Sequence, residues 1–293
     1  MPPFTSSRAV VAAALSTLGA GPALVLAAEP AAGFPWPNGA RAAVALTYDD
    51  GMDVHLDHAA PDLDAAGLKG TFYVPGHSES LARRLPEWRA LALRGHELGN
   101  HALFHPCLAS PPGGGDRGWV RPEYALEGYT IERIVDEARV MNTLLLALDG
   151  RSERTFAYNC AETTAGGKSY VDALRPHFLA ARIGDDRVVD DVRGLDPFLV
   201  PSWAVENTSG EEMVAFVRKA ADAGGLAVFM FHGVGGGWIP VTREAHRQLL
   251  EWLAAHRDVV WTGTLREVMA HVVAGREAAG RGPASVTERA PAR

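Results

Sequence analysis

Two adjacent carboxylates follow an apolar segment near the start of the chain. The stretch ALTYDDGMD places Asp49 and Asp50 directly after residues 42–48, which have the composition of a buried strand. Two negative charges at the end of a core element are costly unless another group stabilises them. The pair alone leaves two interpretations open, because it could cap a following helix or serve a chemical site.

A pair of histidines supplies the second part of a candidate metal site. In NHALFHP, His101 and His105 are four residues apart, a spacing of about 6 Å along one face of a helix. Both rings could then reach one ion, with metal–nitrogen distances of about 2.0–2.1 Å for zinc. Two histidines and one aspartate leave a coordination position open for a water whose pKa the ion lowers. We therefore expect one aspartate to bind the ion and its neighbour to remain free as a base.

Polar residues also end two further apolar segments. Tyr158 and Asn159 follow the segment TFA, and His232 follows LAVFMF. The carboxyl ends of parallel strands form the active-site face of a barrel. The sequence therefore predicts that separate strands bring these side chains, the two aspartates and the histidine pair to one rim.

The elements that must position this rim alternate along the chain. Strands are expected at 42–48, 71–74, 96–100, 155–158, 178–183, 198–201, 226–231 and 259–262. Helices are expected near 56–66, 80–94, 130–148, 169–177, 210–223, 242–256 and 264–273. This alternation predicts an α/β fold with parallel strands, and the continuous apolar runs predict strands buried on both faces. Seven or eight such units favour a closed barrel, with an open doubly wound sheet as the alternative.

The composition is that of a globular, exported protein. The first 28 residues have one basic residue, an Ala-rich apolar run and small residues at the end, which is the pattern of a secretory signal peptide. Gly19, Gly21 and Pro22 interrupt the run, which favours cleavage over a transmembrane anchor. Without this segment the chain has 27 bases and 35 acids, a net charge of −8. We therefore expect a secreted or periplasmic protein that binds no nucleic acid and keeps no stable membrane span.

The motifs resemble the polysaccharide deacetylases of carbohydrate esterase family 4, the NodB-homology group. The resemblance rests on TYDDG, GLKGTFYV, GHELGNH with a second histidine, and a late FMFHG, in this order. It implies a NodB-like, distorted (β/α) barrel of seven or eight parallel strands in a single domain at 41–274. Residues 29–40 are then a lead-in segment, and residues 275–293 are a flexible tail.

The resemblance also implies roles for six residues. Asp49 resembles the base, and Asp50, His101 and His105 resemble the ligands of one divalent metal, zinc first, with cobalt, manganese or nickel as alternatives. The backbone N–H of Tyr158 would help to hold the oxyanion, and His232 would protonate the leaving group. The implied activity is hydrolysis of N-acetyl or O-acetyl groups of a carbohydrate polymer or oligosaccharide by a metal-bound water. The implied partner is therefore an acetylated carbohydrate.

The chain departs from the family pattern at three places. Ala102 stands where a hydroxyl residue usually follows the first histidine. The arginine that pairs with the base is missing from TFAY, and Arg154, one position away, is expected to point to the other side of the strand. The carboxylate that tunes the acid histidine is unclear, since Asp196 and the pair at 185–186 compete for it and Trp203 fits the motif only loosely.

Two further features surround the candidate site. Cys107 and Cys160 lie two residues past His105 and Tyr158, so a disulfide is expected if both motifs surround one metal. The long loop at 106–129 and the glycine-rich segment near 235 carry three aromatic residues that could stack on sugar rings: Trp119, Tyr124 and Trp238. Alternative functions remain open at this point, namely a non-catalytic carbohydrate-binding relative or a hydrolase of a small cyclic amide.

Overall fold

The structure is a computed structural model that describes residues 33–278 and residue 280. The predicted signal peptide at 1–28 lies outside the described residues, as do residues 29–32 of the lead-in segment and most of the predicted tail. The described part of the lead-in packs in the core, where Phe34 and Trp36 are buried. Residues 275–278, which were predicted to belong to the tail, are part of helix α8 (Leu265–Ala278).

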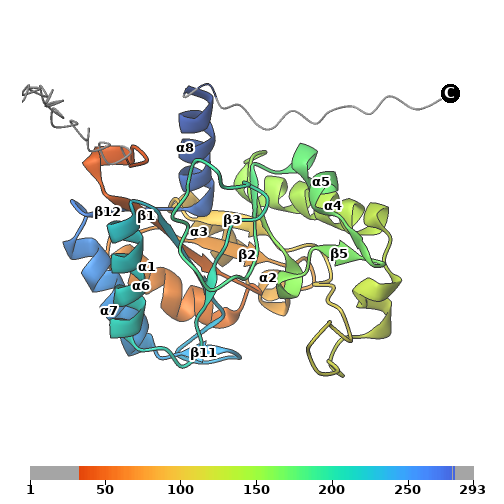
Figure 1. The fold of residues 1–293 in the computed structure, drawn as a ribbon. Helices are drawn as coiled ribbons and strands as arrows, with labels where there is room; N and C mark the ends of the chain where they lie inside the picture. The colour runs from red at the N-terminus through yellow and green to blue at the C-terminus, as the bar shows by residue number, and fades with distance from the viewer. Residues whose placement is uncertain (1–32, 279, 281–293) are drawn as a thin grey trace, which may run out of the picture. The chain divides into compact units, whose positions relative to one another are not determined.

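Eight parallel strands form the central sheet (Figure 1). Their order is β7 (Ala180–Arg182), β4 (Thr155–Ala157), β3 (Glu97–Asn100), β2 (Thr71–Val74), β1 (Ala42–Tyr48), β9 (Leu226–Phe231) and β8 (Trp203–Ala204). The eighth strand, β12 (Val260–Gly263), pairs with the first half of β1, while β2 pairs with its last two residues.

The sheet curls so that its two ends approach each other. Val200, just before β8, forms a parallel bridge with Arg182 of β7. Because β8 also pairs with β9, this bridge links the two ends of the strand order. The predicted distorted (β/α) barrel of seven or eight parallel strands is therefore confirmed.

Helices cover the outside of the sheet. They are α1 (Ala60–Ala65), which follows the π-helical turn η2 (His55–Ala59), α2 (Glu79–Arg83), α3 (Leu85–Leu93), α4 (Ile131–Asp149), α5 (Val171–Leu174), α6 (Gly210–Ala223), α7 (Arg243–Ala255) and α8. Figure 1 shows α6 and α7 side by side on one flank and α4 and α5 on the other. Ser209 and Glu212 form the predicted capping box of α6, in which each side chain bonds to the other residue's backbone N–H. No described helix has the length and apolar character needed to cross a membrane.

The core explains why β1 is apolar throughout. All seven of its residues are buried. Val44, Leu46 and Tyr48 belong to a cluster that includes residues of α6 and α7, whereas Ala43 and Ala45 face a second cluster that includes residues of α8. A strand buried on both faces leaves no place for a charge except at its ends, so the carboxylates stand just beyond Tyr48.

Buried histidines should make the fold sensitive to acid. The His246 ring is fully buried on α7, where Nε2 lies 2.8 Å from the Tyr48 hydroxyl. Burial lowers the pKa of His246 from 6.5 to about 4. Because the unfolded chain binds this proton more readily, stability is lost as the pH falls from 6.5 towards 4, by about 3 kcal/mol for a shift of this size.

Urea unfolding at about pH 7 and about pH 4.5 measures this effect. His246→Gln keeps an amide that can bond with Tyr48 but does not titrate, so the variant should lose less stability on acidification than the wild type. Equal losses in the two proteins would show that His246 does not contribute to the acid sensitivity.

Candidate active site

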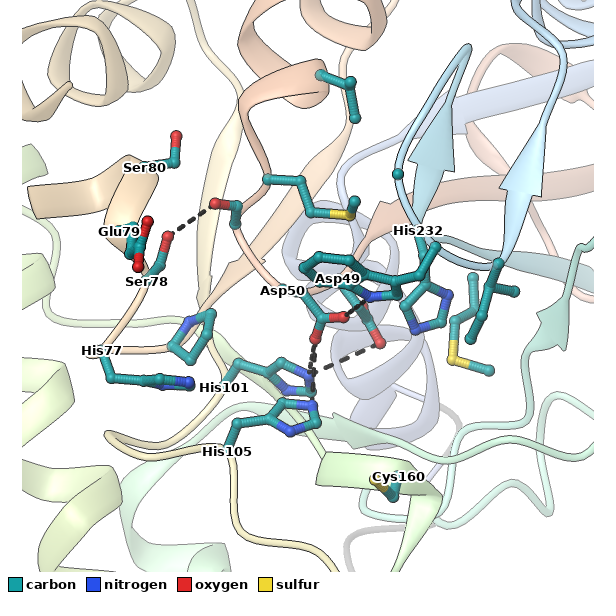
Figure 2. A pocket seen from close by; sticks show the side chains of 18 of the residues that line it. Asp49, Asp50, His77, Ser78, Glu79, Ser80, His101, His105, Cys160 and His232 are labelled. Atoms are coloured by element: carbon teal, nitrogen blue, oxygen red, sulfur yellow. Dashed lines mark hydrogen bonds and ion pairs between the residues drawn. The ribbon is translucent and has the colours of Figure 1, made fainter. Parts of the chain in front are cut away.

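The ends of the strands bring the predicted residues to one cavity (Figure 2). Asp49 and Asp50 follow β1, His101 follows β3, Tyr158 follows β4 and His232 follows β9. His105 reaches the same place from the loop after β3. The cavity has a volume of about 1180 Å³, and all six side chains are among its lining residues.

Asp50, His101 and His105 form a group that can hold a metal ion. Oδ1 of Asp50 lies 3.4 Å from Nε2 of His101 and 3.1 Å from Nε2 of His105, and the donor atoms of all three lie within 4.8 Å of one another. Ligands of a tetrahedral ion with bonds of about 2.0–2.1 Å are about 3.3–3.4 Å apart. The three atoms are therefore spaced as ligands of one small cation would be.

The hydrogen bond of His101 fixes which of its ring nitrogens carries the proton in the neutral form. Nδ1 of His101 lies 2.9 Å from the carbonyl oxygen of Ala157, which can only accept, so Nδ1 is the donor. Nδ1 of His105 lies 3.6 Å from Sγ of Cys107, a disulfide sulfur that has no proton to give. With Nδ1 protonated in each ring, both Nε2 atoms direct a lone pair at Asp50 Oδ1, a buried atom that has no hydrogen bond among the described residues. Three acceptors facing one another fit a bound cation.

The loop that carries the histidines is not helical. Residues 102–104 form a turn, Ala102 has a φ of 57°, and His105 just after the turn has a φ of 50°. The helical face expected from the four-residue spacing is therefore wrong, although the two rings still meet with their centroids 4.8 Å apart. Asp50 also has a positive φ, 77°. Such conformations cost about 1–3 kcal/mol each and cluster at functional sites.

The two carboxylates are held in their charged forms by different partners. Burial opposes the ionisation of Asp50, but when the rings of His101 and His105 are protonated on Nε2, hydrogen bonds and charge from them outweigh burial and hold the pKa of Asp50 well below 3.8. Burial also opposes the ionisation of Asp49, but the guanidinium of Arg182 and, after it, His101 and His232 lower its pKa. Both side chains are thus ionised near neutral pH.

Arg182 is the residue of this site that the sequence interpretation missed. Its Nη2 donates to both Oδ1 and Oδ2 of Asp49 at 2.5 Å, and both side chains are buried. The arginine that is missing from TFAY is therefore replaced by one from β7, which pairs with Asp49. The sequence did contain an indication of this role, because Arg182 is the single charged residue inside the predicted buried strand at 178–183. Arg154 instead pairs with Asp149.

The backbone of Tyr158 does not fit the role that the resemblance implied. Its N–H donates to the carbonyl oxygen of Arg182 at 3.1 Å, as part of the pairing between β4 and the end of β7. This amide is not free to hold an oxyanion, so the prediction for Tyr158 is corrected. The buried hydroxyl of Tyr158 has no hydrogen-bond partner among the described residues.

His232 lies beside Asp49 and Asp50 (Figure 2), and none of the described carboxylates is hydrogen-bonded to its ring. Its Nδ1 is buried without a partner in the described part of the chain. The competing acids bond elsewhere, Asp196 to Arg175 and Asp185 to Arg187. Burial lowers the pKa of His232 below 6.5, although the charges of Asp49 and Asp50 oppose this shift.

The three predicted aromatic residues lie in different surroundings. Trp119 and Trp238 line the cavity and are 63% and 56% exposed. Trp238 also donates from Nε1 to Oδ2 of Asp50 at 2.6 Å, so its indole orients a candidate ligand. Tyr124 is not among the lining residues, and its ring stacks on Phe104 with centroids 4.8 Å apart. The prediction of sugar contact by Tyr124 is therefore not supported by its position.

The predicted disulfide between Cys107 and Cys160 is present, with the Cα atoms 5.8 Å apart. It joins the loop of His105 to the turn after β4. This cross-link closes a loop of 53 residues and fixes the position of His105 relative to Ala157, the hydrogen-bond acceptor of His101.

Comparisons with known proteins find similarity to one family model and to two curated proteins. Residues 37–168 match the model of a family described as polysaccharide deacetylase. A peptidoglycan-N-acetylglucosamine deacetylase from Bacillus cereus is 38% identical over 71 residues, which are 24% of this chain and 25% of that protein. A gellan lyase from Bacillus sp. is 23% identical over 275 residues, which are 83% of this chain and 10% of the lyase. The matched regions thus span a quarter or less of each curated relative.

One solved structure shares the fold over nearly its whole length. It comes from Mycobacterium smegmatis, where it is described as a candidate polysaccharide deacetylase. The TM-score is 0.60 at 19% identity, and the match covers 90% of this chain and 99% of that chain. At this identity the likeness concerns the fold.

Proposed function

This chain is related to the polysaccharide deacetylase family, and from that premise we propose that it is a metal-dependent hydrolase of acetyl groups on a carbohydrate. The observation that carries the proposal is the convergence of Asp50, His101 and His105 on one point, with the ionised Asp49 beside them. The bond is an acetamide or an acetate ester of a polymer or oligosaccharide. The N-terminal sequence supports export as the route to such a substrate.

Asp50, His101 and His105 would hold the ion, with zinc as the first candidate. When bound, a divalent ion supplies a Lewis acid and lowers the pKa of a water that it binds. Trp238 would keep Asp50 oriented, because the indole N–H occupies the second carboxylate oxygen. The hydrogen bond from Nδ1 of His101 to the carbonyl oxygen of Ala157 would keep the His101 ring oriented.

The neighbouring side chains would move the protons. Asp49 would accept a proton from the attacking water, since Arg182 keeps it ionised and leaves it no proton of its own. His232 would donate a proton to the leaving nitrogen or oxygen. Its lowered pKa makes it a stronger acid than a free imidazole, so activity should fall as the pH rises through that pKa.

Arg182 is expected to position and ionise the base. Arg182→Met leaves Asp49 buried without its partner, which costs about 3–5 kcal/mol of stability and raises the pKa of Asp49. The rate of acetate release per folded molecule should therefore fall, and the acidic limb of the pH–rate profile should move to higher pH. The pH–rate profile and urea unfolding measure both effects.

Arg154→Met is the matched control for this prediction. It breaks another buried arginine–aspartate pair, with Asp149, at the start of β4 and away from the cavity. We expect a comparable loss of stability with an unchanged pH–rate profile. Identical profiles in the two variants would remove Arg182 from the proposed mechanism.

Acetate release tests the proposed function directly. The protein is stripped with a chelator, reloaded with zinc, cobalt, manganese or nickel, and offered chitin oligomers, peptidoglycan and acetylated xylan. We expect release from at least one class, loss of release on stripping and recovery on reloading. No release from any class by the reloaded protein would contradict the proposal.

A further inference from the structure

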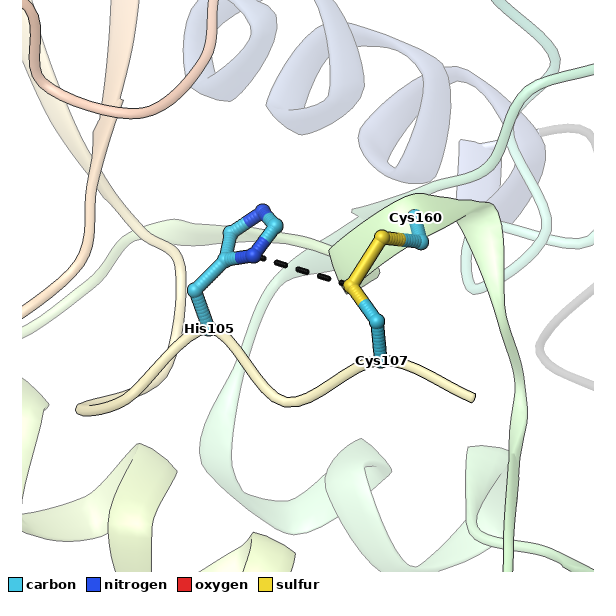
Figure 3. A group of neighbouring side chains, drawn as sticks. All are labelled: His105, Cys107 and Cys160. Carbon is cyan, nitrogen blue, oxygen red and sulfur yellow. Dashed lines mark hydrogen bonds between the residues drawn. A yellow bond between two sulfur atoms is a disulfide. The ribbon is translucent and has the colours of Figure 1, made fainter. Parts of the chain in front are cut away.

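His105 lies between two sets of metal-binding atoms. Its Nε2 faces Oδ1 of Asp50 at 3.1 Å, and its Nδ1 faces Sγ of Cys107 at 3.6 Å. Figure 3 shows the ring beside the disulfide, with Nδ1 directed at the nearer sulfur. The donor atoms of His105, Cys107 and Cys160 all lie within 4.8 Å of one another. The second set consists of one nitrogen and two sulfurs, but the disulfide bond now engages both sulfurs.

We propose that reduction of the disulfide creates a second metal site from Nδ1 of His105 and the thiolates of Cys107 and Cys160. Thiolate and imidazole ligands select zinc and similar soft divalent ions. Two thiolates on one tetrahedral zinc lie about 3.8 Å apart, so the sulfurs need to separate by less than 2 Å from their bonded distance. The cavity can supply a water as the fourth ligand, because Cys160 lines it.

A dithiol can carry out this reduction from the cavity. Cys107 is fully buried, whereas Cys160 is only partly buried and lines the cavity. A thiolate of the dithiol attacks Sγ of Cys160, and the sulfur of Cys107 leaves as a thiolate. The second thiol of the reagent then displaces Cys160, so two electrons pass to the protein and the reagent becomes a cyclic disulfide. Any proton on either cysteine is released when the ion binds.

The two sites compete for the same ring. A neutral imidazole has one lone pair, so His105 ligates through Nε2 or through Nδ1 but not through both. In the oxidised chain the sulfurs offer no thiolate. Nε2 of His105 therefore remains available to bind an ion together with Asp50 and His101. In the reduced chain the thiolates draw the ion to Nδ1, and the first site loses a ligand. This second consequence rests on the proposed function, and it makes disulfide formation the step that commits His105 to the active site.

Cobalt(II) is the probe for the new site, because thiolate ligation gives an intense near-ultraviolet charge-transfer band. The whole protein is reduced with dithiothreitol, freed of reagent under argon and titrated with cobalt(II), in parallel with the oxidised protein. His101→Ala impairs the first site and keeps all three donors of the second. Cys107→Ser with Cys160→Ser removes both thiolates and keeps the first site's donors.

We expect the band at one cobalt per chain in reduced wild type and reduced His101→Ala. We expect none in the oxidised proteins or in the double serine variant. A reduced wild type with two titratable thiols, an intact circular dichroism spectrum and no band would overturn the proposal. Because the band is read without a substrate, it separates this proposal from the proposed function. A protein that is inactive when oxidised but shows the band when reduced contradicts only the proposed function. A protein that is active when oxidised but shows no band when reduced contradicts only the present proposal.

Discussion

Replacing His101 with alanine should remove metal binding and acetate release together. His101 is one of only three protein ligands in the proposed site, and its Nε2 is fixed towards Asp50 by the hydrogen bond to Ala157. Loss of groups that merely support a ligand costs about 10–100-fold in metal affinity or activity, so loss of the ligand itself should cost more than about 100-fold. Metal content after dialysis and the rate of acetate release at saturating zinc measure both effects.

His96→Ala is the matched control for this variant. His96 precedes β3 and is buried like His101, but it lies at the opposite end of that strand and bonds to Asp64. We expect its replacement to reduce stability and to leave metal content unchanged. A His101→Ala protein that keeps one zinc per chain would show that the ion is held elsewhere.

Asp49→Asn should separate catalysis from metal binding. The substitution keeps the shape of the side chain but removes the base, and general bases typically contribute about 10²–10⁴-fold to a rate. Metal content should stay near that of the wild type, since Asp49 is not one of the three proposed ligands. Equilibrium dialysis with zinc and single-turnover acetate release measure the two quantities.

Asp49→Asn should also destabilise the fold, because it leaves Arg182 buried with a neutral partner. A control variant with a similar loss of stability is therefore needed. Asp149→Asn produces the same defect at Arg154, away from the cavity. We expect the two variants to lose stability alike, whereas only Asp49→Asn loses turnover. Normal hydrolysis by Asp49→Asn would show that another group serves as the base.

The sequence predicts the barrel well because its inner strands are apolar on both faces. The ranges 42–48, 71–74 and 226–231 match β1, β2 and β9 to the residue. The apolar range 198–201 is displaced, because Pro201 has no N–H for a strand ladder, and the structure has a single bridge at Val200 and then β8. The carboxyl ends of parallel strands lie at one rim of the barrel. The positions of Asp49, Asp50, His101 and His232 directly after predicted strands were therefore enough to predict that these side chains meet.

What the sequence could not give is contact between strands that are distant along the chain. Arg182 reaches Asp49 only because the curled sheet brings β7 near the end of β1. The amide of Tyr158 is engaged for the same reason, since β4 and β7 are neighbours. Tyr124 illustrates a different limit, because a loop aromatic packs wherever an apolar partner lies, here on Phe104.

The central claim is that Asp50, His101 and His105 hold one divalent ion. Anomalous diffraction from crystals of the oxidised protein grown with zinc tests it most directly. The account predicts one strong peak about 2.0–2.2 Å from Asp50 Oδ1 and from Nε2 of both histidines, with Asp49 outside bonding distance. A fully active crystal preparation with no peak between these three side chains would contradict it.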